Sequence, residues 1–594
     1  MEHANHWQTV NQRLMARIVA ECSYEGLLTP EHKGEDRFEL DTGENRYQFH
    51  ARRTPWDFLW VRPQSLLRNG FPCSDAIQLV LDCREAFDMG DITLGNFIEE
   101  LNNTLAGDLL RQQALAGRKA AELLDLPPAR LETLLDGHPK VLANRGRIGW
   151  GMDDLHRYSP EANQPVTLRW LAAHRATGLR VFGQPAAEPC LTVSERKELA
   201  PYLRSRDWQL VPIHPWQWQH HIQPQYAAML QSGNLVDLGP RGHRYLPQQS
   251  IRTLSDLDAP GACDLKLSLT ILNTSCYRGI PPEPMALAPD LSTWLATTAS
   301  ADPFLAAAGL SVQRELGGVH LPHPHQQQVA GTPYRYREML GAVWRESLAS
   351  KTTDGEKAWI FAMLMQTDAD GTPLVAEMVR RSGCSVKDWL TRLFDRVTLP
   401  LYHLLCCYGV GLVAHGQNLG VIFHQWQPDR VVIKDFHGDL RLVESDLPSQ
   451  AGMPDALAGA LPRLPATHLL HDLYTGHLVT GLRFLSPLLE DHLGYPERDF
   501  YRLLHERIVR YQQAHPDLAQ QFRTFDLFRP VMERVCLNRV RFRIGYGDDA
   551  IRPTPTLGPE LPNPLHATNH QACDQSTHET SHQPRYQTKE TCDE

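Results

Sequence analysis

The stretch Lys266-Leu-Ser-Leu-Thr-Ile271 alternates strictly between polar and apolar residues. This alternation is typical of a β-strand that buries one face. The polar face carries a lysine and two hydroxyls, and the chain continues through Asn273-Thr-Ser-Cys-Tyr-Arg278. A cluster of the same kind, Ser250-Ile-Arg-Thr253, lies upstream. Arginine, lysine and hydroxyl side chains gathered in this way suit an anion such as a carboxylate or polyphosphate. A strand with a solvated polar face would show the same pattern.

Length and composition narrow the classes of protein. A chain of 594 residues predicts roughly three or four domains. The net charge is −10 and no basic tract is present, so we expect neither nucleic acid nor a membrane as a partner. The N-terminus lacks an apolar targeting segment, which predicts a cytoplasmic protein. The twelve cysteines are scattered without a C-x-x-C pair, so their spacing predicts reduced thiols and no zinc or iron–sulfur site.

The N-terminal part, residues 1–136, has the pattern of a mixed α/β scaffold. Trp7, Val10, Leu14 and Ile18 recur at helical spacing. Asp41-Thr-Gly-Glu44 separates two strand-like runs and predicts a hairpin. At the other end, residues 551–594 are rich in Pro, Thr, His, Gln and Asn without apolar periodicity. This composition predicts a disordered tail.

Two polar segments lie between the scaffold and the Lys266 strand. Gly137-His-Pro-Lys140 and Asn144-Arg-Gly-Arg147 are typical of a loop. Gly146 would let backbone approach a phosphate, but the loop taken alone favours a solvated basic surface. His214-Pro-Trp-Gln-Trp-Gln-His-His221 begins a helix at Pro215. Its histidines lack zinc-ligand spacing, so we reject a zinc site there.

The C-terminal half contains a second candidate site. A helix is predicted over 334–346, which makes Arg345 a weak candidate, and a long helix over 389–408. Leu419–Phe423 and Arg430–Ile433 then read as a hairpin, with His415, Gln417 and Asn418 at its start and Asp435 at its end. An amide oxygen and a carboxylate facing each other suit Mg²⁺ that carries nucleotide phosphates. Polar turn residues on an exposed hairpin are the alternative.

Several common motifs are missing. There is no G-x-x-x-x-G-K-[ST], no G-x-G-x-x-G and no G-x-S-x-G. Asn418 and Asp435 resemble the Mg²⁺-binding pair of protein kinases, but the position of the kinase catalytic Asp is held by Val413. Without that base, phosphoryl transfer to a hydroxyl is disfavoured, and attack at another phosphorus of ATP is favoured.

A set of polar motifs runs along the chain: Gly137-His-Pro139, His214-Pro-Trp-Gln217, Ser250-x-Arg-Thr253, Lys266 to Arg278, Ala414-His-Gly-Gln-Asn418 and Lys434-Asp435. Together they resemble the IucA/IucC family of NRPS-independent siderophore synthetases. They occur in order over roughly residues 5–550. The resemblance implies an α+β fold shaped like a cupped hand, often dimeric, so we expect a homodimer. Residues 1–136 would form the thumb, 137–325 the fingers and 326–550 the palm.

The resemblance also implies a reaction. A citrate-derived carboxylate attacks the α-phosphate of ATP, and an amine displaces AMP from the acyl-adenylate to form an amide. The motifs are most similar to the branch that joins a citryl monoamide to N6-acetyl-N6-hydroxylysine. Another acid or amine remains an alternative.

The resemblance assigns roles to residues of this chain. Ser250, Arg252, Thr253 and Lys266 would bind the triphosphate, with His138 beside it. Thr274, Arg278 and His415 would orient the carboxylate, with Arg345 implied by position. Asn418 and Asp435 would bind Mg²⁺ and nucleotide. Lys266, Arg278 and His415 are the catalytic candidates, and His415 is a candidate proton acceptor because its ordinary pKa lies near neutrality.

The sequence departs from the family pattern at one position, and two other functions remain as alternatives. Many family members have Glu where this chain has Val413, so metal ligation would rest on Asp435 and water; we interpret the valine as the mark of a subtype. A kinase-like phosphotransferase would release ADP. A ferric-siderophore reductase, which the C-terminal half resembles, needs a terminal cysteine cluster that this sequence lacks.

Overall fold

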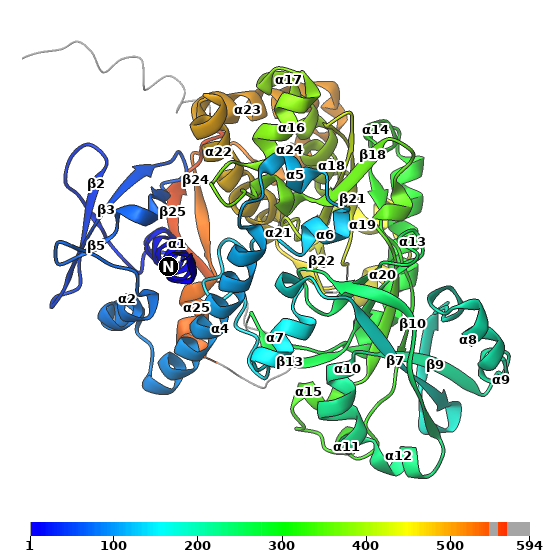
Figure 1. Cartoon of the computed structure of the whole chain (residues 1–594). Coiled ribbons are helices and arrows are strands. Elements are labelled where there is room, and N and C mark those ends of the chain that lie inside the picture. The colour runs from blue at the N-terminus through cyan, green and yellow to red at the C-terminus, as the bar shows by residue number, and fades with distance from the viewer. Residues whose placement is uncertain (1, 275, 437, 546–555, 567–594) are drawn as a thin grey trace, which may run out of the picture.

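The computed structural model describes residues 2–274, 276–436, 438–545 and 556–566. Three regions surround its centre (Figure 1). The N-terminal region lies at the left, a sheet with short helices lies at the lower right, and a largely helical region lies above. Helices are combined with mainly antiparallel sheets, which confirms the predicted α+β class. Within the described residues, no helix is both long enough and apolar enough to cross a membrane.

The N-terminal region packs two long helices against a small sheet. Helix α1 (Glu2–Tyr24) buries Val10, Leu14 and Ile18 against the sheet and against α4 (Asp91–Leu115), as the helical spacing predicts. The sheet contains β1 (Glu31–His32), β2 (Arg37–Asp41), β3 (Arg46–Arg53), β4 (Leu59–Val61), β5 (Leu67–Arg68) and β6 (Phe71–Pro72). Strands β2 and β3 pair antiparallel, so the predicted hairpin is confirmed.

The second region is built on an eight-stranded sheet. In spatial order the strands are β8 (Arg180–Gly183), β16 (Glu315–His320), β17 (Gly341–Glu346), β12 (Cys263–Leu267), β11 (Thr253–Asp256), β10 (Leu235–Pro247), β7 (Val166–His174) and β9 (Trp208–Ile213). One apolar core joins Leu168, Leu265 and Trp344 across it. Because β17 belongs to this core, we propose that the boundary predicted at 325 lies after Glu346 instead.

The stretch around Lys266 differs from the prediction. It forms two strands, β12 and β13 (Leu269–Asn273), which break at Ser268 and enter different sheets. Every residue from Cys263 to Asn273 is buried, so the polar face is not solvated. The Ser268 hydroxyl donates to the carbonyl of Glu338 at 2.7 Å. The Thr270 hydroxyl accepts from the side chain of Gln217 at 2.7 Å. The alternation therefore reflects internal hydrogen bonding.

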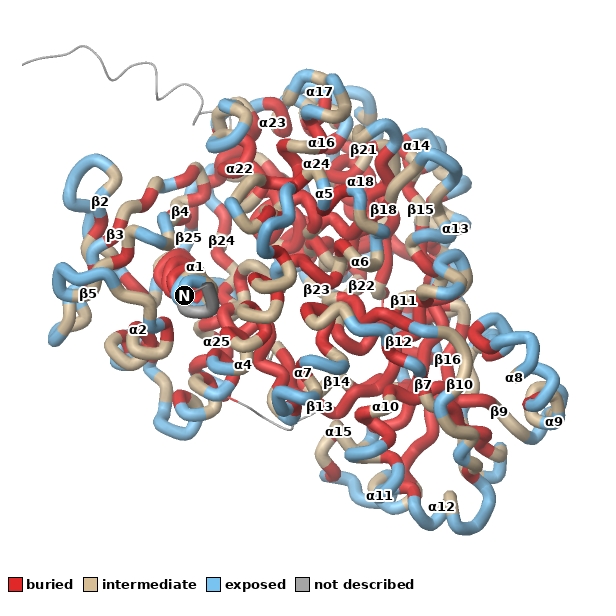
Figure 2. Tube along the Cα trace, viewed as in Figure 1, coloured by how far each residue is buried: buried red, intermediate tan, exposed pale blue. Residues whose placement is uncertain are grey.

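The third region contains the predicted hairpin. Helix α17 (Val386–Leu393) continues through a π-helical turn (Phe394–Thr398) into α18 (Leu399–Tyr408). Pro400 lacks an N–H, which fits the changed hydrogen bonding. After α18, β20 (Leu419–His424) pairs antiparallel with β21 (Gln427–Ile433), which confirms the hairpin. Strands β15 (Ser311–Val312) and β18 (Glu356–Ile360) complete its sheet. Figure 2 shows buried and half-buried stretches along β18 and β21.

Two further sequence predictions are wrong. The helix predicted over 334–346 is one short turn, α15 (Tyr334–Arg337), followed by strand β17. The strand pairs with β12 and β16 on its two sides, and these distant partners override the local helical pattern. The tail prediction fails over β25 (Thr556–Pro562), which pairs antiparallel with β24 (Val531–Cys536). The rest of the 551–594 prediction, apart from 563–566, lies outside the described residues.

Two segments far apart in the sequence meet in the N-terminal region. Glu25, just after α1, accepts hydrogen bonds from the backbone N–H groups of Leu537, Asn538 and Arg539 at 2.8–3.1 Å. These groups begin helix α25 (Asn538–Ile544), and a carboxylate there satisfies N–H groups that have no partner within the helix. Segments about 510 residues apart therefore form one structural unit.

Candidate active site

A cavity of about 390 Å³ lies where the three regions meet, and we call it the central cavity. All but two of the predicted site residues line it: His138, Ser250, Arg252, Lys266, Thr274, Arg278, His415, Asn418 and Asp435. Thr253 and Arg345 lie behind the wall. Thr253 pairs with Lys266 between neighbouring strands, and its N–H donates to the Ser250 hydroxyl at 3.3 Å. The structure thus brings together residues that are far apart in the sequence.

A buried group of charges forms one wall. Lys266 makes an ion pair and hydrogen bond with Asp435, which follows the β20–β21 hairpin. Arg345 reaches the other carboxylate oxygen, with Nη1 3.6 Å from Oδ2, and it is 1% exposed. The Arg252 guanidinium donates to the carbonyl of Gly279. Arg345 is therefore a buried cation on a strand and not the solvated helical arginine that the sequence indicated.

The electrostatics of this group favour an anionic ligand. Burial alone would raise the pKa of Asp435, but the charges of Lys266 and Arg345 outweigh it and hold that pKa well below its usual range. Burial lowers the pKa of Lys266, and Asp435 opposes that effect. Asp435 is thus ionised and placed beside more than one cation. Cations held in a buried site interact strongly with a phosphate or carboxylate.

The hairpin supplies oxygen atoms for a cation. The Asn418 amide donates from Nδ2 to the carbonyl of Val413 at 3.0 Å and to Asp439 Oδ2 at 3.2 Å. Because both contacts use the nitrogen, Oδ1 is the atom left for a metal ion. Asp439 also lines the central cavity, and the sequence analysis missed it. Its position four residues after Asp435 was the available signal.

The two cavity histidines are neutral near pH 7. Their rings are perpendicular, with centroids 5.8 Å apart. Burial, and then the charges of His415 and Lys140, lower the pKa of His138 to about 3. Burial also lowers the pKa of His415, against the carboxylates Asp439 and Asp435. His415 Nδ1 accepts the N–H of Gln417 at 3.2 Å, which leaves the proton on Nε2. This tautomer donates to a substrate oxygen, so the geometry favours the orienting role of His415 over that of proton acceptor.

Backbone conformation is unusual around the central cavity. Arg147, Ile251, Thr274 and Asp435 have φ values of 40°, 58°, 49° and 67°. This left-handed region is unfavourable for residues other than glycine, above all for β-branched ones. Such conformations persist where the surrounding structure enforces them, and they cluster at functional sites. Their gathering around one cavity supports its assignment as the active site.

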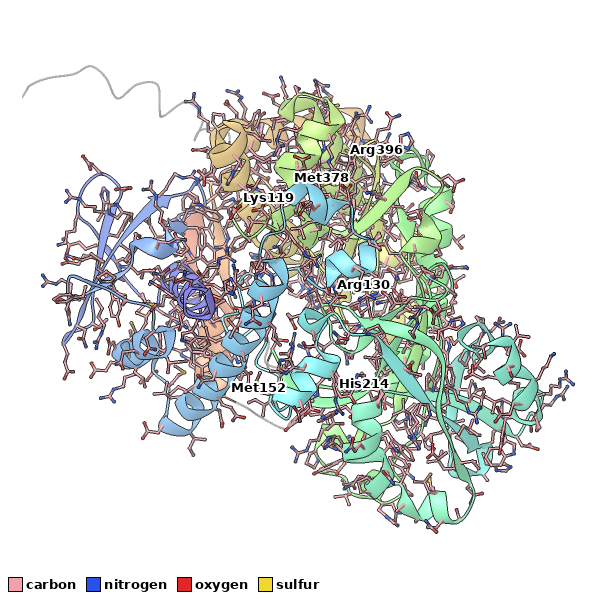
Figure 3. All side chains as sticks on the ribbon, in the orientation of Figure 1. Lys119, Arg130, Met152, His214, Met378 and Arg396 are labelled. Carbon is pink, nitrogen blue, oxygen red and sulfur yellow. The ribbon has the colours of Figure 1, made fainter. Side chains whose placement is uncertain are left out.

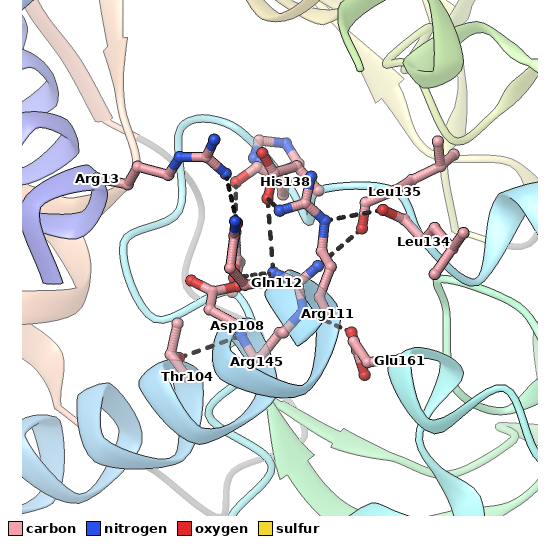
Figure 4. Close-up of polar contacts among 12 residues, drawn as sticks. Arg13, Thr104, Asp108, Arg111, Gln112, Leu134, Leu135, His138, Arg145 and Glu161 are labelled. Carbon is pink, nitrogen blue, oxygen red and sulfur yellow. Dashed lines mark hydrogen bonds and ion pairs between the residues drawn. The ribbon is translucent and has the colours of Figure 1, made fainter. Parts of the chain in front are cut away.

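Arg145 of the loop over 137–150 is held by a network of buried polar contacts (Figure 4). Arg145 is 1% exposed and binds Asp108 of α4 at 2.6 Å and the carbonyl of Leu135 at 2.8 Å. Arg147 pairs with Glu161 at 2.8 Å. A Cβ on Gly146 would lie 2.6 Å from Oε1 of Glu100. The loop is therefore not the solvated surface that it suggests when taken alone, and Gly146 is needed for packing against Glu100.

Histidines buried without charge predict a pH dependence of stability. Burial lowers the pKa of His138, His214 and His477 to about 3, whereas histidine in an unfolded chain titrates near 6.5. Below that pH the unfolded chain binds protons that the folded protein does not. The stabilisation that each neutral histidine gives to the folded protein is therefore complete above about pH 6.5. It is lost as the pH falls toward 3, at about 1.4 kcal/mol of unfolding free energy per pH unit for each histidine.

We expect His477→Gln to reduce this pH slope of the free energy of unfolding. Urea unfolding between pH 7 and 5 measures it, with the exposed His424→Gln as the control. His477 is 0% exposed and forms a hydrogen bond with Thr398 at 2.9 Å, so the substitution also lowers the stability itself. The test compares pH slopes, so it requires only that the variant is folded at pH 7. Equal slopes for the two variants would contradict the prediction.

Comparison with known proteins identifies the family. Residues 128–366 match the IucA / IucC family, and residues 387–549 match a ferric iron reductase FhuF-like transporter family. Aerobactin synthase of Escherichia coli is 39% identical over 95% of this chain and 98% of its own length. Aerobactin synthetase IucC from a hypervirulent pathotype of Klebsiella pneumoniae has a TM-score of 0.85 at 36% identity, covering 95% of this chain and 99% of the other.

A further structure shares the fold. ATP-bound aerobactin synthetase IucA from a hypervirulent pathotype of Klebsiella pneumoniae has a TM-score of 0.76 at 18% identity, covering 94% of this chain and 99% of the other. The chain belongs to the IucA/IucC family of siderophore synthetases, which are ligases. Within it, the similarity to aerobactin synthase extends over nearly the whole length of both chains.

Proposed function

We propose that this chain catalyses the last step of aerobactin synthesis. It would use ATP to adenylate a citryl monoamide and would then join the carboxylate to N6-acetyl-N6-hydroxylysine, releasing AMP and pyrophosphate. The observation that carries the proposal is the central cavity, in which buried cations face the oxygen-rich hairpin. The similarity to aerobactin synthase and to an ATP-bound synthetase supports it.

The cations would act on the triphosphate. Attack of a carboxylate on the α-phosphate brings two anions together, and preorganised positive charge stabilises the transition state more than the separated reactants. Lys266 and Arg252, with the Ser250 hydroxyl, line one wall of the central cavity. Thr253 and Arg345 support this wall from behind through strand pairing and the ion pair with Asp435.

The donor atoms of the hairpin fit Mg²⁺. Asp435 is ionised, the oxygen of Asn418 is left for a cation, and Asp439 adds a second carboxylate. Hard oxygen ligands of this kind suit Mg²⁺ that also contacts phosphates. When bound, the ion would neutralise charge on the triphosphate. Val413 takes part through its backbone carbonyl, which orients Asn418.

The carboxylate substrate would bind at the end of β13. The Arg278 guanidinium donates from Nη2 to the carbonyl of Asn273 at 2.7 Å. Its Nε is buried without a partner among the described residues, so it can still donate to a carboxylate. Thr274 and His415 line the same cavity. His138 would lie beside the phosphates and exclude water.

Pyrophosphate release tests the function. Purified protein with ATP and Mg²⁺ would receive citrate or citryl monoamide, each with and without N6-acetyl-N6-hydroxylysine. We expect turnover that requires the monoamide and the hydroxylysine derivative together, with AMP as the nucleotide product. Turnover with free citrate would assign the first condensation instead. ADP would overturn adenylation, and a coloured iron–sulfur protein would favour a reductase.

We expect Arg278→Ala to raise the KM for the acid at least about 10-fold while ATP binding is kept, because a charge-assisted hydrogen bond contributes about 1.5–3 kcal/mol. Steady-state kinetics with each substrate varied in turn measure this. Arg337→Ala is the control, since Arg337 does not line the central cavity and its guanidinium donates to the carbonyl of Thr332 at 3.2 Å. A change confined to the KM for ATP would contradict the assignment.

The homodimer and the cytoplasmic location remain predictions. The molar mass of the purified protein in solution tests the first, and cell fractionation tests the second.

A further inference from the structure

Helix α18 carries a group of metal-binding side chains away from the central cavity. His403 and Cys407 are four residues apart, so they share one face of the helix. Asp302, which precedes helix α14 (Pro303–Ala308), lies against that face. One ligand atom from each of the three lies within 4.8 Å of the others. None of the three lines the central cavity.

From this group we propose that Asp302, His403 and Cys407 form a binding site for a divalent transition metal of the zinc type. The donor set is one carboxylate oxygen, one imidazole nitrogen and one sulfur. Mixed oxygen, nitrogen and sulfur donors suit Zn²⁺ or Co²⁺ and do not suit Mg²⁺ or Ca²⁺. Cysteine spacing along the sequence gave no sign of the site, because the third ligand is about 100 residues distant.

The surrounding hydrogen bonds hold the ligands as metal sites require. Asp302 Oδ1 accepts the N–H of Leu305 at 2.8 Å, and Oδ2 accepts the Tyr408 hydroxyl at 2.9 Å. His403 Nδ1 contacts the Tyr511 hydroxyl at 2.7 Å, while Nε2 faces Asp302 Oδ2 at 3.1 Å. A ligating histidine characteristically uses its second nitrogen in an outer hydrogen bond, and a ligating carboxylate is itself hydrogen-bonded.

The burial of the site fits a metal that is bound from solvent. His403 is buried under the ring of Phe304, with centroids 4.7 Å apart, whereas Asp302 and Cys407 are half-buried. His515 lies next to His403, with ring centroids 5.7 Å apart. Its Nδ1 bonds the carbonyl of Tyr511 at 2.9 Å, which leaves Nε2 as a donor atom. Water can therefore complete a four-coordinate shell, with His515 close by but outside the three-residue group.

Binding requires small movements and the release of one proton. In a tetrahedral site with bonds of about 2.0–2.3 Å, ligand atoms lie roughly 3.5 Å apart. Asp302 Oδ2 and His403 Nε2 are already 3.1 Å apart, so the Cys407 sulfur is the atom that side-chain rotation has to bring closer. Cys407 binds as a thiolate and its proton passes to solvent. The proton that His403 Nε2 shares with Asp302 moves to Nδ1, which then donates to the Tyr511 hydroxyl. The metal would join α14 to the C-terminal end of α18.

Titration of metal-free, full-length protein with Co²⁺ tests the proposal. We expect one Co²⁺ per chain with a thiolate-to-cobalt charge-transfer band in the near ultraviolet, displaced by Zn²⁺ but not by excess Mg²⁺. Zn²⁺ should also raise the thermal midpoint. The band should vanish in Cys407→Ser and persist in the matched control Cys384→Ser, whose half-buried thiol lies outside the group.

Two further variants separate ligation from a structural effect. Asp302→Asn keeps an oxygen for the Leu305 N–H but loses the charged ligand, so it should weaken binding by more than about 100-fold, and Tyr511→Phe should weaken it by about 10-fold. Pyrophosphate release with Mg²⁺ should be unchanged in both. A Co²⁺ spectrum without the sulfur band, a band that survives in Cys407→Ser, or affinity no better than millimolar would each overturn the proposal.

Discussion

Replacing Lys266 by methionine is expected to lower the rate of pyrophosphate formation by about 100- to 1000-fold, which is the usual effect of losing one donor aimed at transition-state charge. Lys266 is 4% exposed and lies on the central strand β12. We choose methionine because it keeps much of the volume of the buried lysine side chain. The substitution removes a cation that contacts Asp435 and leaves Arg345 beside it. Single-turnover assays with saturating ATP and acid measure the chemical step directly.

Stability has to be measured alongside activity in this variant. Removing one partner of a buried ion pair costs about 3–5 kcal/mol, although Arg345 remains beside Asp435. Lys119→Met is the control for the loss of an ion pair elsewhere, because the exposed Lys119 pairs with Asp370 outside the central cavity. Lys119 is labelled in the upper half of Figure 3. A folded Lys266→Met protein with near-normal turnover would refute the assignment of Lys266 to the triphosphate.

Asp435→Asn is expected to separate ATP binding from turnover. Turnover should fall by more than about 100-fold, because the amide is a poor substitute for a carboxylate that holds a metal ion. Binding of ATP without Mg²⁺ should be unchanged or tighter, since the substitution removes a negative charge beside Lys266 and Arg345. Calorimetric titration with ATP, with and without Mg²⁺, measures both effects.

The other end of the same hairpin provides the control. Asp429 lies in β21 and pairs with Arg430 at 3.2 Å outside the central cavity. Asp429→Asn should therefore leave turnover and the affinity for ATP unchanged. If Asp435→Asn weakened ATP binding equally with and without Mg²⁺, Asp435 would be a structural partner of Lys266 and not a metal ligand.

Local patterns in the sequence predicted the parts of the site that depend on local structure. The hairpin places Asn418 and Asp435 together because its two strands pair directly, with Leu419 opposite Ile433. Gly, Pro and Asn placed residues 137–150 on a loop, and they do lie on one. The roles of these residues rest on the family resemblance and remain predictions.

Features that depend on distant partners were not predictable in this way. The sequence pattern predicted a helix at Arg345, but the residue lies in a strand. That strand is fixed by its pairing with β12 and β16, which come from elsewhere in the chain. The Lys266 strand appeared half-exposed because the partners of Ser268 and Thr270, the carbonyl of Glu338 and Gln217, lie 70 and 53 residues away. Buried polar groups are satisfied wherever a partner is available, and a single sequence does not show which residue it is.

The hydrogen bonds between Glu25 and the start of α25 have a consequence for synthesis on the ribosome. Chains are made from the N-terminus, and domains generally fold as they emerge. The partners of Glu25 are Leu537, Asn538 and Arg539, and Asn538 and Arg541 also line the central cavity. In a nascent chain, Glu25 therefore lacks these hydrogen-bond partners until nearly the whole polypeptide has been translated. We expect the central cavity to be completed only near the end of synthesis, so that shorter ribosome-bound chains lack activity.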